Sequence, residues 1–251
     1  MNYNIKEVRG LQLAVQNVEK GYEGRRVLKN VTFDVDSHEF ICILGHSGCG
    51  KSTLLNLIAG FLQPDSGSVT VNGVPVKGPS KSRGVVFQDH ALFPWYKVID
   101  NIAFGPEVQG KSKAEAMEIA HKYLKLVGLE DYAEHLPDQL SGGMKQRVGI
   151  ARALASGPDI LLMDEPFGAL DVLTREMMQK ELLRIWLELR PSVLFITHSL
   201  SEAVYLADRI MVMKDGDVAG EFRVTMDRPR SNQHPEFIGL MREIQKLLTD
   251  E

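Results

Sequence analysis

Residues 40–60 read FICILGHSGCGKSTLLNLIAG, and this stretch decides the fold. Its first five residues form a short apolar run, which is typical of a buried strand, and residues 51–59 have a helix-like pattern. Between them, residues 45–52 (GHSGCGKS) match a loop of the pattern Gly, four residues, Gly, Lys and Ser. A strand, a glycine-rich loop and a helix in this order predict a phosphate-binding loop in an α/β protein.

The residue types of this loop suit a nucleotide. Glycines let the backbone turn tightly and bring amide N–H groups and the helix N-terminus close to phosphates. We expect Lys51 beside the β- and γ-phosphates, the Ser52 hydroxyl on Mg²⁺, and Thr53 on a phosphate. A purely structural glycine-rich turn is the less favoured alternative. The predicted nucleotide-binding loop comprises Gly45, His46, Ser47, Gly48, Cys49, Gly50, Lys51, Ser52 and Thr53.

Two carboxylates follow another apolar run, at residues 160–165 (ILLMDE). Asp164 would lie at the end of a buried strand near the phosphate loop. There it would hold Mg²⁺ through water or through Ser52. Glu165 would face the γ-phosphate and polarise an attacking water as a general base. The alternative is a solvated strand end, which is less favoured behind a phosphate loop.

The remaining pattern predicts an α/β fold. Short apolar runs at 84–87, 160–163 and 193–196 indicate buried strands of a mostly parallel sheet, and residues 31–36 alternate like a half-exposed strand. Residues 174–189 have helical spacing. The segment from about 89 to 157 is helical in pattern and lacks buried-strand runs, so we expect a helical insert there.

Composition limits the function. The chain has 251 residues, 44% of them hydrophobic, and a formal net charge of −4, which disfavours nucleic acid as a partner. The two cysteines, Cys42 and Cys49, form no disulfide framework and favour a reducing cytosol. No apolar run approaches the roughly 18 residues of a membrane span, and residues 1–10 lack the apolar stretch of a signal peptide. We expect a protein that is neither exported nor membrane-spanning.

Residues 140–147 (LSGGMKQR), followed by ILLMDE, resemble the signature of ATP-binding-cassette ATPases. The resemblance covers about residues 11–230. It implies a P-loop NTPase of the RecA-like type with an antiparallel N-terminal β region, and it implies ATP hydrolysis with Mg²⁺. We expect one cassette domain over residues 1–251, with a core at about 11–88 and 158–230, a helical subdomain at about 89–157 and a C-terminal helix at about 235–250.

The signature itself predicts a second anion-binding helix start. Ser141 is a good helix N-cap, and Gly142 and Gly143 permit close approach of backbone, although a plain capped helix has the same pattern. The resemblance implies that this signature covers the ATP held by a second copy of the chain. We therefore expect a head-to-tail dimer with two ATP molecules.

Further positions match the family one at a time. Tyr22 resembles the aromatic residue that stacks on adenine, and Gln88 the glutamine that senses Mg²⁺ and the attacking water. His198 resembles the histidine that contacts the γ-phosphate and holds Glu165, and Asp171 the aspartate that couples the two sites of the dimer. Packing or solvent exposure is the alternative for each residue alone. The implied catalytic residues are Lys51, Gln88, Glu165 and His198, and the implied metal-binding residues are Ser52, Gln88 and Asp164.

Two positions depart from the family pattern. Met144 stands where many members have Gln, and Gly168 stands where Ser is frequent. Neither replaces a residue with an assigned chemical role, so we expect hydrolysis to be retained.

Residues 87–105 (FQDHALFPWYKVIDNIAFG) resemble the nitrate, sulfonate and taurine branch of bacterial import ATPases. In that branch this region meets a short cytoplasmic helix of the permease, and the elements PFGALD and RPR agree with it. The resemblance implies an importer subunit at the cytoplasmic face of the inner membrane. Its partners would be permease subunits and, indirectly, an extracytoplasmic binding protein for a small anionic solute such as a sulfonate, taurine or nitrate.

Alternatives remain at this point. The aromatic residues at 92–96 could fill the core of the insert instead of forming a docking groove. A soluble cassette ATPase acting on nucleic acid or ribosomes is disfavoured by the net charge and the absence of a basic arm. An ATPase of an exporter or lipid machine stays open. Residues 235–250 predict an amphipathic helix that packs on the core of the chain, with no further regulatory domain after it.

Overall fold

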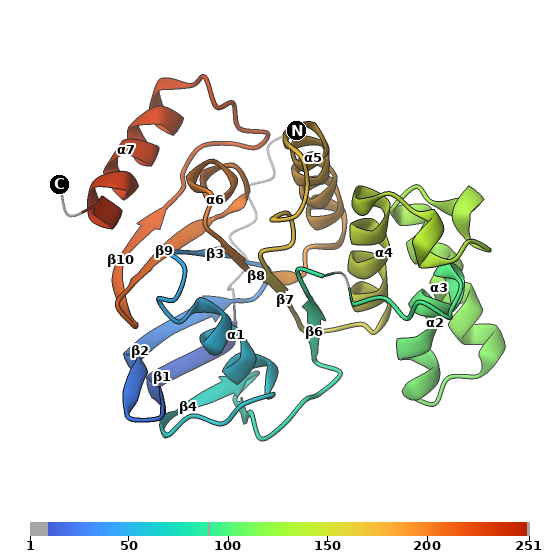
Figure 1. The fold of residues 1–251 in the computed structure, drawn as a ribbon, viewed down its shortest axis with the longest axis horizontal. Coiled ribbons are helices and arrows are strands. Elements are labelled where there is room, and N and C mark those ends of the chain that lie inside the picture. Colours follow the sequence, from blue (N-terminus) through green and yellow to red (C-terminus); the bar gives the residue numbers. More distant parts are fainter. Residues whose placement is uncertain (1–9, 90, 250–251) are drawn as a thin grey trace.

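A six-stranded sheet with the order β10-β9-β3-β8-β7-β6 forms the centre of the molecule (Figure 1). The computed structural model of the protein describes residues 10–89 and 91–249. Strands β9, β3, β8, β7 and β6 are parallel, and β10 runs antiparallel to β9. The predicted α/β class with a mostly parallel core is confirmed. The strands are β3 (Phe40–Leu44), β6 (Arg83–Val86), β7 (Ile160–Asp164), β8 (Ser192–Thr197), β9 (Arg209–Lys214) and β10 (Asp217–Arg223).

A second sheet is antiparallel and lies at the N-terminal part of the chain, with the order β2-β1-β4-β5. The alternation predicted for residues 31–36 is confirmed, because Val31, Phe33 and Val35 are buried while Thr32 and Asp34 are exposed. The strand begins earlier than predicted. The strands are β1 (Leu11–Tyr22), β2 (Arg25–Asp36), β4 (Ser66–Val71) and β5 (Val74–Pro75).

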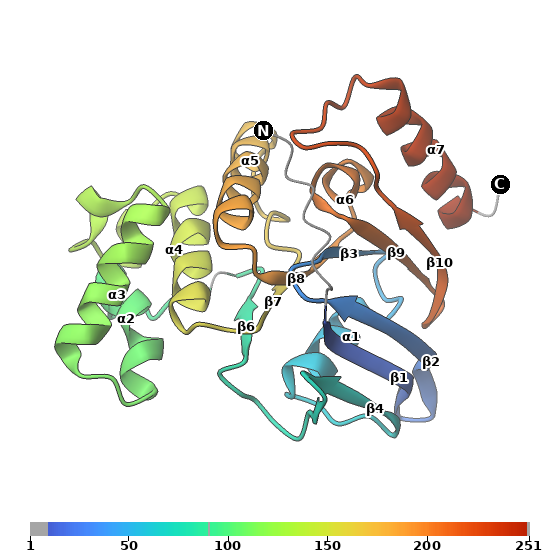
Figure 2. The same ribbon diagram turned by 180° about the vertical axis from the view of Figure 1, so that it is seen from behind.

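The helices lie in distinct groups around the central sheet. Figures 1 and 2 show α2, α3 and α4 together beyond β6 and α5, α1 beside the antiparallel sheet, and α7 at the opposite end near β10. The described residues between β6 and β7 form helices and 3-10 turns and no strand. The helices are α1 (Lys51–Ala59), α2 (Val98–Val108), α3 (Lys113–Leu126), α4 (Gly142–Ala155), α5 (Val172–Leu189), α6 (Leu200–Leu206) and α7 (Pro235–Thr249), with 3-10 helices at Glu130–Tyr132 and Pro137–Gln139.

The side chains of β3 alternate between two hydrophobic clusters, one on each face of the central sheet. Phe40, Cys42 and Leu44 face the helices α2 to α7, whereas Ile41 and Ile43 face α1 and the antiparallel sheet. A strand buried on both faces needs a continuous apolar run, and residues 40–44 supply one. The end of β3 is thereby held rigidly between two layers, and the phosphate loop starts there.

Some predicted details differ. Val85 is only half-buried and Phe87 is 37% exposed, because β6 is the edge strand of its sheet. Helix α5 begins at Val172 rather than 174, and Met177 is 67% exposed while Met178 is buried.

The predicted packing of the tail helix is confirmed. In α7, Phe237 and Ile244 are buried, and four further apolar residues are partly buried against the same core cluster, namely Leu240, Met241, Leu247 and Leu248. Residues 1–9, on which the signal-peptide prediction depends, lie outside the described residues, as does His90 of the predicted docking segment. None of the described helices combines the length and the apolar character that crossing a membrane requires.

Candidate nucleotide site

The phosphate loop joins β3 to α1 and needs glycine at defined points. A Cβ on Gly45 would lie 2.4 Å from the Met213 carbonyl oxygen, and Gly50, with φ of 103°, would place one 2.6 Å from a Leu28 methyl group. Gly50 is the N-cap of α1, and no side chain caps this helix start. The first backbone N–H groups of α1 are therefore left for a ligand, and the helix dipole favours an anion there.

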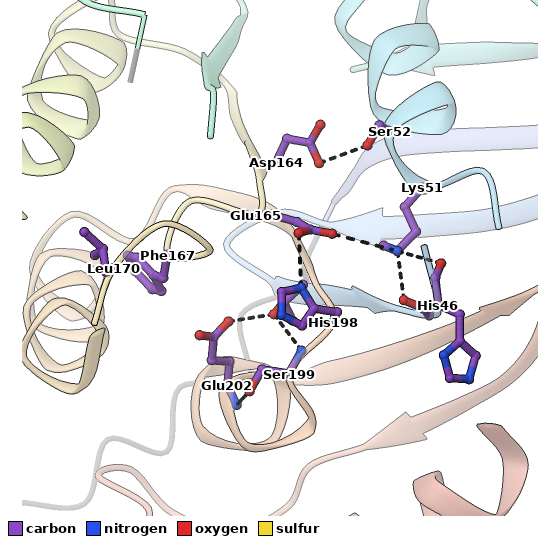
Figure 3. Close-up of polar contacts among 12 residues, drawn as sticks. His46, Lys51, Ser52, Asp164, Glu165, Phe167, Leu170, His198, Ser199 and Glu202 are labelled. Atoms are coloured by element: carbon purple, nitrogen blue, oxygen red, sulfur yellow. Dashed lines mark hydrogen bonds and ion pairs between the residues drawn. The ribbon is translucent and has the colours of Figure 1, made fainter. Parts of the chain in front are cut away.

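Lys51 is buried in the first turn of α1, with only 5% of the residue exposed. Its Nζ donates hydrogen bonds to the carbonyl oxygens of Gly45 (2.8 Å) and His46 (3.0 Å). The same atom lies 4.0 Å from Oε1 of Glu165 (Figure 3). The ammonium group is thus fixed above the loop, where it adds positive charge to the helix start.

Ser52 and Asp164 meet between α1 and the end of β7. Ser52 Oγ donates to Asp164 Oδ1 at 3.2 Å (Figure 3). Burial raises the pKa of the Asp164 carboxyl, the hydrogen bond from Ser52 lowers it, and the neighbouring Glu165 raises it. A hydroxyl and a partly buried carboxylate are oxygen donors of the kind that Mg²⁺ prefers, and a cation would relieve the burial of the carboxylate charge. The residues present therefore fit this metal.

Glu165 lies between two predicted catalytic residues. Its carboxylate has Oε1 facing Lys51, and Oε2 lies 3.1 Å from Nδ1 of His198. The backbone of Glu165 has φ of 43°, in the left-handed region, and its N–H donates to the Ile196 carbonyl at 3.0 Å. Lys51, Glu165 and His198 come from three different elements and point toward one another (Figure 3).

Gln88 follows the edge strand β6 and is exposed. A Cβ on Gly168 would lie 3.1 Å from Gln88 Nε2 and 3.3 Å from the Glu165 carbonyl oxygen. The departure from the family pattern at Gly168 thus falls where the Gln88 amide approaches the backbone of the loop after Glu165. A side chain at position 168 would require one of the two to shift.

The signature residues lie elsewhere. Ser141 caps α4, because its Oγ accepts a hydrogen bond from the Met144 amide at 3.3 Å. A Cβ on Gly143 would lie 2.8 Å from Cγ2 of Thr174 on α5, so this glycine permits helix contact. Figures 1 and 2 show α4 and α1 separated by β6, β7 and α5. One chain therefore does not bring the two glycine-rich helix starts together.

Asp171 caps the helix next to this contact. Its Oδ1 accepts a hydrogen bond from the Thr174 amide at 3.1 Å, and this bond lowers the pKa of the Asp171 carboxyl. The residue stands at the start of α5, at the end of the loop that begins with Glu165. The loop thus connects the carboxylate beside Lys51 with the helix that touches the signature.

Tyr22 ends strand β1 and is 44% exposed, with Lys20 Nζ 5.8 Å from its ring centroid. A cavity of about 560 Å³ adjoins the phosphate loop, and Tyr22 is not among its lining residues. Most of this lining is not predicted from the sequence, because its Arg and Lys residues come from strands β2 and β9, which carry no motif. The lining residues are Arg25, Arg26, Val27, Lys29, His46, Ser47, Gly48, Cys49, Met213, Lys214, Asp215 and Gly216.

The aromatic segment after Gln88 is only partly packed. Leu92 packs against the core, whereas Trp95 is 70% exposed and its ring centroid lies 5.8 Å from that of Phe93. Phe93 also contacts Phe104 at 4.7 Å. Both Phe93 and Phe104 line a groove between β6, α2 and α4, together with Phe87, Val108 and Arg152.

Known proteins resemble this chain in sequence and in structure. The ABC transporter family profile matches residues 28–168. The nitrate import ATP-binding protein NrtD of Synechococcus elongatus is 50% identical over 211 residues, covering 82% of this chain and 77% of that protein. The taurine import ATP-binding protein TauB of Rhizobium johnstonii is 48% identical, covering 90% of each chain. A dimeric ATP-binding cassette in a post-hydrolysis state with ADP and Pi superposes with a TM-score of 0.75 at 34% identity, covering 86% of this chain and all of that one.

Proposed function

The chain belongs to the ABC transporter family and is an ATPase with the P-loop NTPase fold, and we propose that it energises a membrane importer. The observation that carries the chemistry is the position of the Glu165 carboxylate between Lys51 and His198. Three charged or titratable side chains meet there beside an uncapped helix start. This arrangement suits phosphoryl transfer to water, which depends on positioning and charge stabilisation.

In the proposed mechanism the phosphate loop and the start of α1 bind the ATP phosphates through backbone amides. Lys51 turns from the carbonyls of Gly45 and His46 to the β- and γ-phosphates, and Thr53 adds a phosphate contact. Glu165 accepts a proton from the attacking water. His198 holds the Glu165 carboxylate and contacts the γ-phosphate.

The proposed metal ligands are Ser52, Asp164 and Gln88. Gln88 also contacts the attacking water. When bound, Mg²⁺ neutralises charge on the β- and γ-phosphates. The 3.2 Å contact between Ser52 and Asp164 supports the pairing of these two oxygens. Gln88 leads into the helices at 98–155, which we propose form a subdomain that moves relative to the core.

We propose that two copies of the chain complete each other head to tail. The separation of α4 from α1 within one chain supports this, because Ser141, Gly142 and Gly143 then contact the γ-phosphate held by the second copy. Asp171 lies between the two sites and couples them. Tyr22 stacks on the adenine ring, which places the base beside the cavity at the phosphate loop.

The importer assignment draws on the relatives for nitrate and taurine, and on the groove that Phe93 lines. A short helix of the permease docks in this groove, so the ATPase resides at the cytoplasmic face of the membrane. An extracytoplasmic binding protein delivers the solute to the permease. The solute is a small anionic molecule such as a sulfonate, taurine or nitrate, and the names of the two import relatives specify nitrate and taurine.

The docking step can be tested by affinity purification of the tagged chain from membranes solubilised in mild detergent. Trp95 is exposed, so Trp95→Ala leaves the fold intact and removes an aromatic anchor whose loss at an interface costs at least about 2 kcal/mol. Recovery of a multi-span partner should fall at least about tenfold. Val108→Glu, on the groove lining, should have the same effect, whereas Tyr132→Ala, an exposed aromatic outside that lining, should have none.

Two results would contradict the proposal. If wild type recovers no multi-span protein and instead recovers ribosomal or other soluble partners, the importer assignment is wrong. If Trp95→Ala and Val108→Glu both retain the membrane partner, docking occurs at another surface.

A further inference from the structure

The loop from Glu165 to Asp171 holds its first residue in an unfavourable backbone conformation. Glu165 has φ of 43°, a region that residues other than glycine adopt at a cost and keep only where their surroundings fix them. Within the loop, Gly168 N–H donates to the Glu165 carbonyl at 3.0 Å, and the Phe167 ring is buried against Phe195. The other backbone groups of this loop must be held by contacts from outside it.

Arg175 on α5 supplies such contacts. Its Nε donates to the Phe167 carbonyl at 3.3 Å, and its Nη2 donates to the Leu170 carbonyl at 2.9 Å. One guanidinium group thereby holds two carbonyl oxygens of the loop that separates Glu165 from Asp171. The planar fork of arginine makes this possible, whereas a lysine ammonium cannot reproduce both directions.

The same guanidinium faces a buried carboxylate behind His198. Arg175 Nε lies 3.7 Å from Oε1 of Glu202, which is only 5% exposed. The other carboxylate oxygen, Oε2, accepts a hydrogen bond of 2.6 Å from the Thr197 hydroxyl. Thr197 directly precedes His198, and its hydroxyl also accepts the Ser199 N–H at 3.0 Å.

Figure 3 shows Glu202 beside Ser199 and His198 at the end of β8. Glu202 is hydrogen-bonded to Thr197, the last residue of β8, directly before His198. It is also paired with Arg175, which holds the loop that starts at Glu165. A buried carboxylate keeps its charge only with a partner of this kind. Glu165 and His198, whose Oε2 and Nδ1 atoms lie 3.1 Å apart, thus each adjoin a segment that these contacts hold.

We propose that Arg175 and Glu202 are positioning residues for ATP hydrolysis, which hold Glu165 and His198 in register across the loop and the strand end. Neither residue needs to touch ATP. This inference rests on the proposed roles of Glu165 and His198. It predicts an effect on turnover that is separate from nucleotide binding, because the contacts of Arg175 and Glu202 given above involve no residue of the phosphate loop or of α1.

The test is steady-state ATPase kinetics of the purified full-length chain with Mg-ATP. For Arg175→Lys and for Glu202→Gln, kcat should fall at least about tenfold, which corresponds to about 1.4 kcal/mol, while KM for ATP stays within about twofold. Arg175→Lys retains a cation beside Glu202, so it decides the question if Glu202→Gln fails to fold. Arg184→Lys is the matched control on the same helix, since Arg184 pairs with the half-buried Glu181 and the exposed Glu188, away from the loop.

The outcomes separate this inference from the function on which it rests. Glu165→Gln, measured in parallel, should lose hydrolysis while still binding ATP. If it does so and the Arg175 and Glu202 variants keep kcat within about twofold, the positioning role is wrong and the base assignment stands. A rise in KM that matches the fall in kcat/KM would also overturn positioning. Retained hydrolysis in Glu165→Gln would overturn the base assignment and this inference with it.

Discussion

The two glycine-rich helix starts of the chain, at α1 and at α4, differ in what they leave open. At α1 no side chain caps the helix, Gly50 has a left-handed backbone, and a buried lysine faces the glycine-rich turn. At α4 Ser141 caps the Met144 amide, and Gly143 is placed for contact with Thr174 of α5. The first leaves amide groups open to a ligand within one chain, and the second is a capped helix end within the chain.

The difference shows that two glycine-rich helix starts in one chain can have different functions. An uncapped helix start with a fixed cation already favours an anion before any partner arrives. At α4 the Ser141 cap already takes up the Met144 amide, so a ligand there meets fewer free donors. The signature therefore gains its proposed function only when a second copy presents a phosphate to it.

The largest effect is expected at α1. Lys51→Ala removes the buried cation and should lower kcat/KM for ATP by about 10² to 10³-fold, the range found when one preorganised charge-stabilising donor is lost. Equilibrium binding of a fluorescent ATP analogue should weaken as well, because the site lies within one chain. Lys122→Ala, an exposed lysine on α3, serves as the control. Unchanged binding by Lys51→Ala would contradict the assignment of α1 as the phosphate site.

A smaller and more selective effect is expected at α4. Ser141→Ala should lower the ATPase rate of the concentrated protein about tenfold, while ATP binding at concentrations that keep the chain monomeric stays unchanged. Loss of the cap also costs about 1 kcal/mol of stability. Ser112→Ala removes the capping-box serine of α3 and should cost similar stability with no change in rate. If the two variants hydrolyse ATP equally well, Ser141 is only a cap.

Sequence reasoning was sufficient where a motif coincides with a rigid element. The order of strand, loop and helix at 40–59 agrees residue by residue with β3 and α1, because an apolar run buried on both faces and a glycine-rich turn permit few alternatives. Lys51, Ser52, Asp164, Glu165 and His198 also come together in the structure. Parallel strands end at one edge of a sheet, so residues after each strand meet there. Their chemical roles remain predictions.

Sequence reasoning failed where position depends on packing between distant segments. Glu202 stands three residues after Ser199, which is the spacing of a capping box, yet its carboxylate turns inward to Thr197. Arg175, on helix α5, is paired with the Glu202 carboxylate on α6, and no local sequence pattern predicts that contact. The basic cavity beside the phosphate loop was missed for the same reason. Met177, one of the apolar residues in the helical spacing of 174–189, is 67% exposed, because α5 packs through Met178.

The smallest predicted effect concerns the charges of two aspartates near these helix starts. Burial raises the pKa of Asp164 in the folded chain, so its stability contribution is complete at low pH and is lost as the pH rises through that value. At pH 7 the nucleotide-free Asp164→Asn variant should therefore melt higher than wild type, by less than the 2–4 °C that about 1 kcal/mol produces in a protein of this size, although it should not hydrolyse ATP. The gain should shrink as the pH falls through this raised pKa, because wild-type Asp164 then becomes protonated. Asp171→Asn is the matched control and should give no gain, because the Thr174 amide already lowers the pKa of that carboxyl.

Thermal melts of both variants from pH 7 downward test this prediction. A lower melting temperature for Asp164→Asn than for wild type at pH 7 would show that the site does not carry an unrelieved charge.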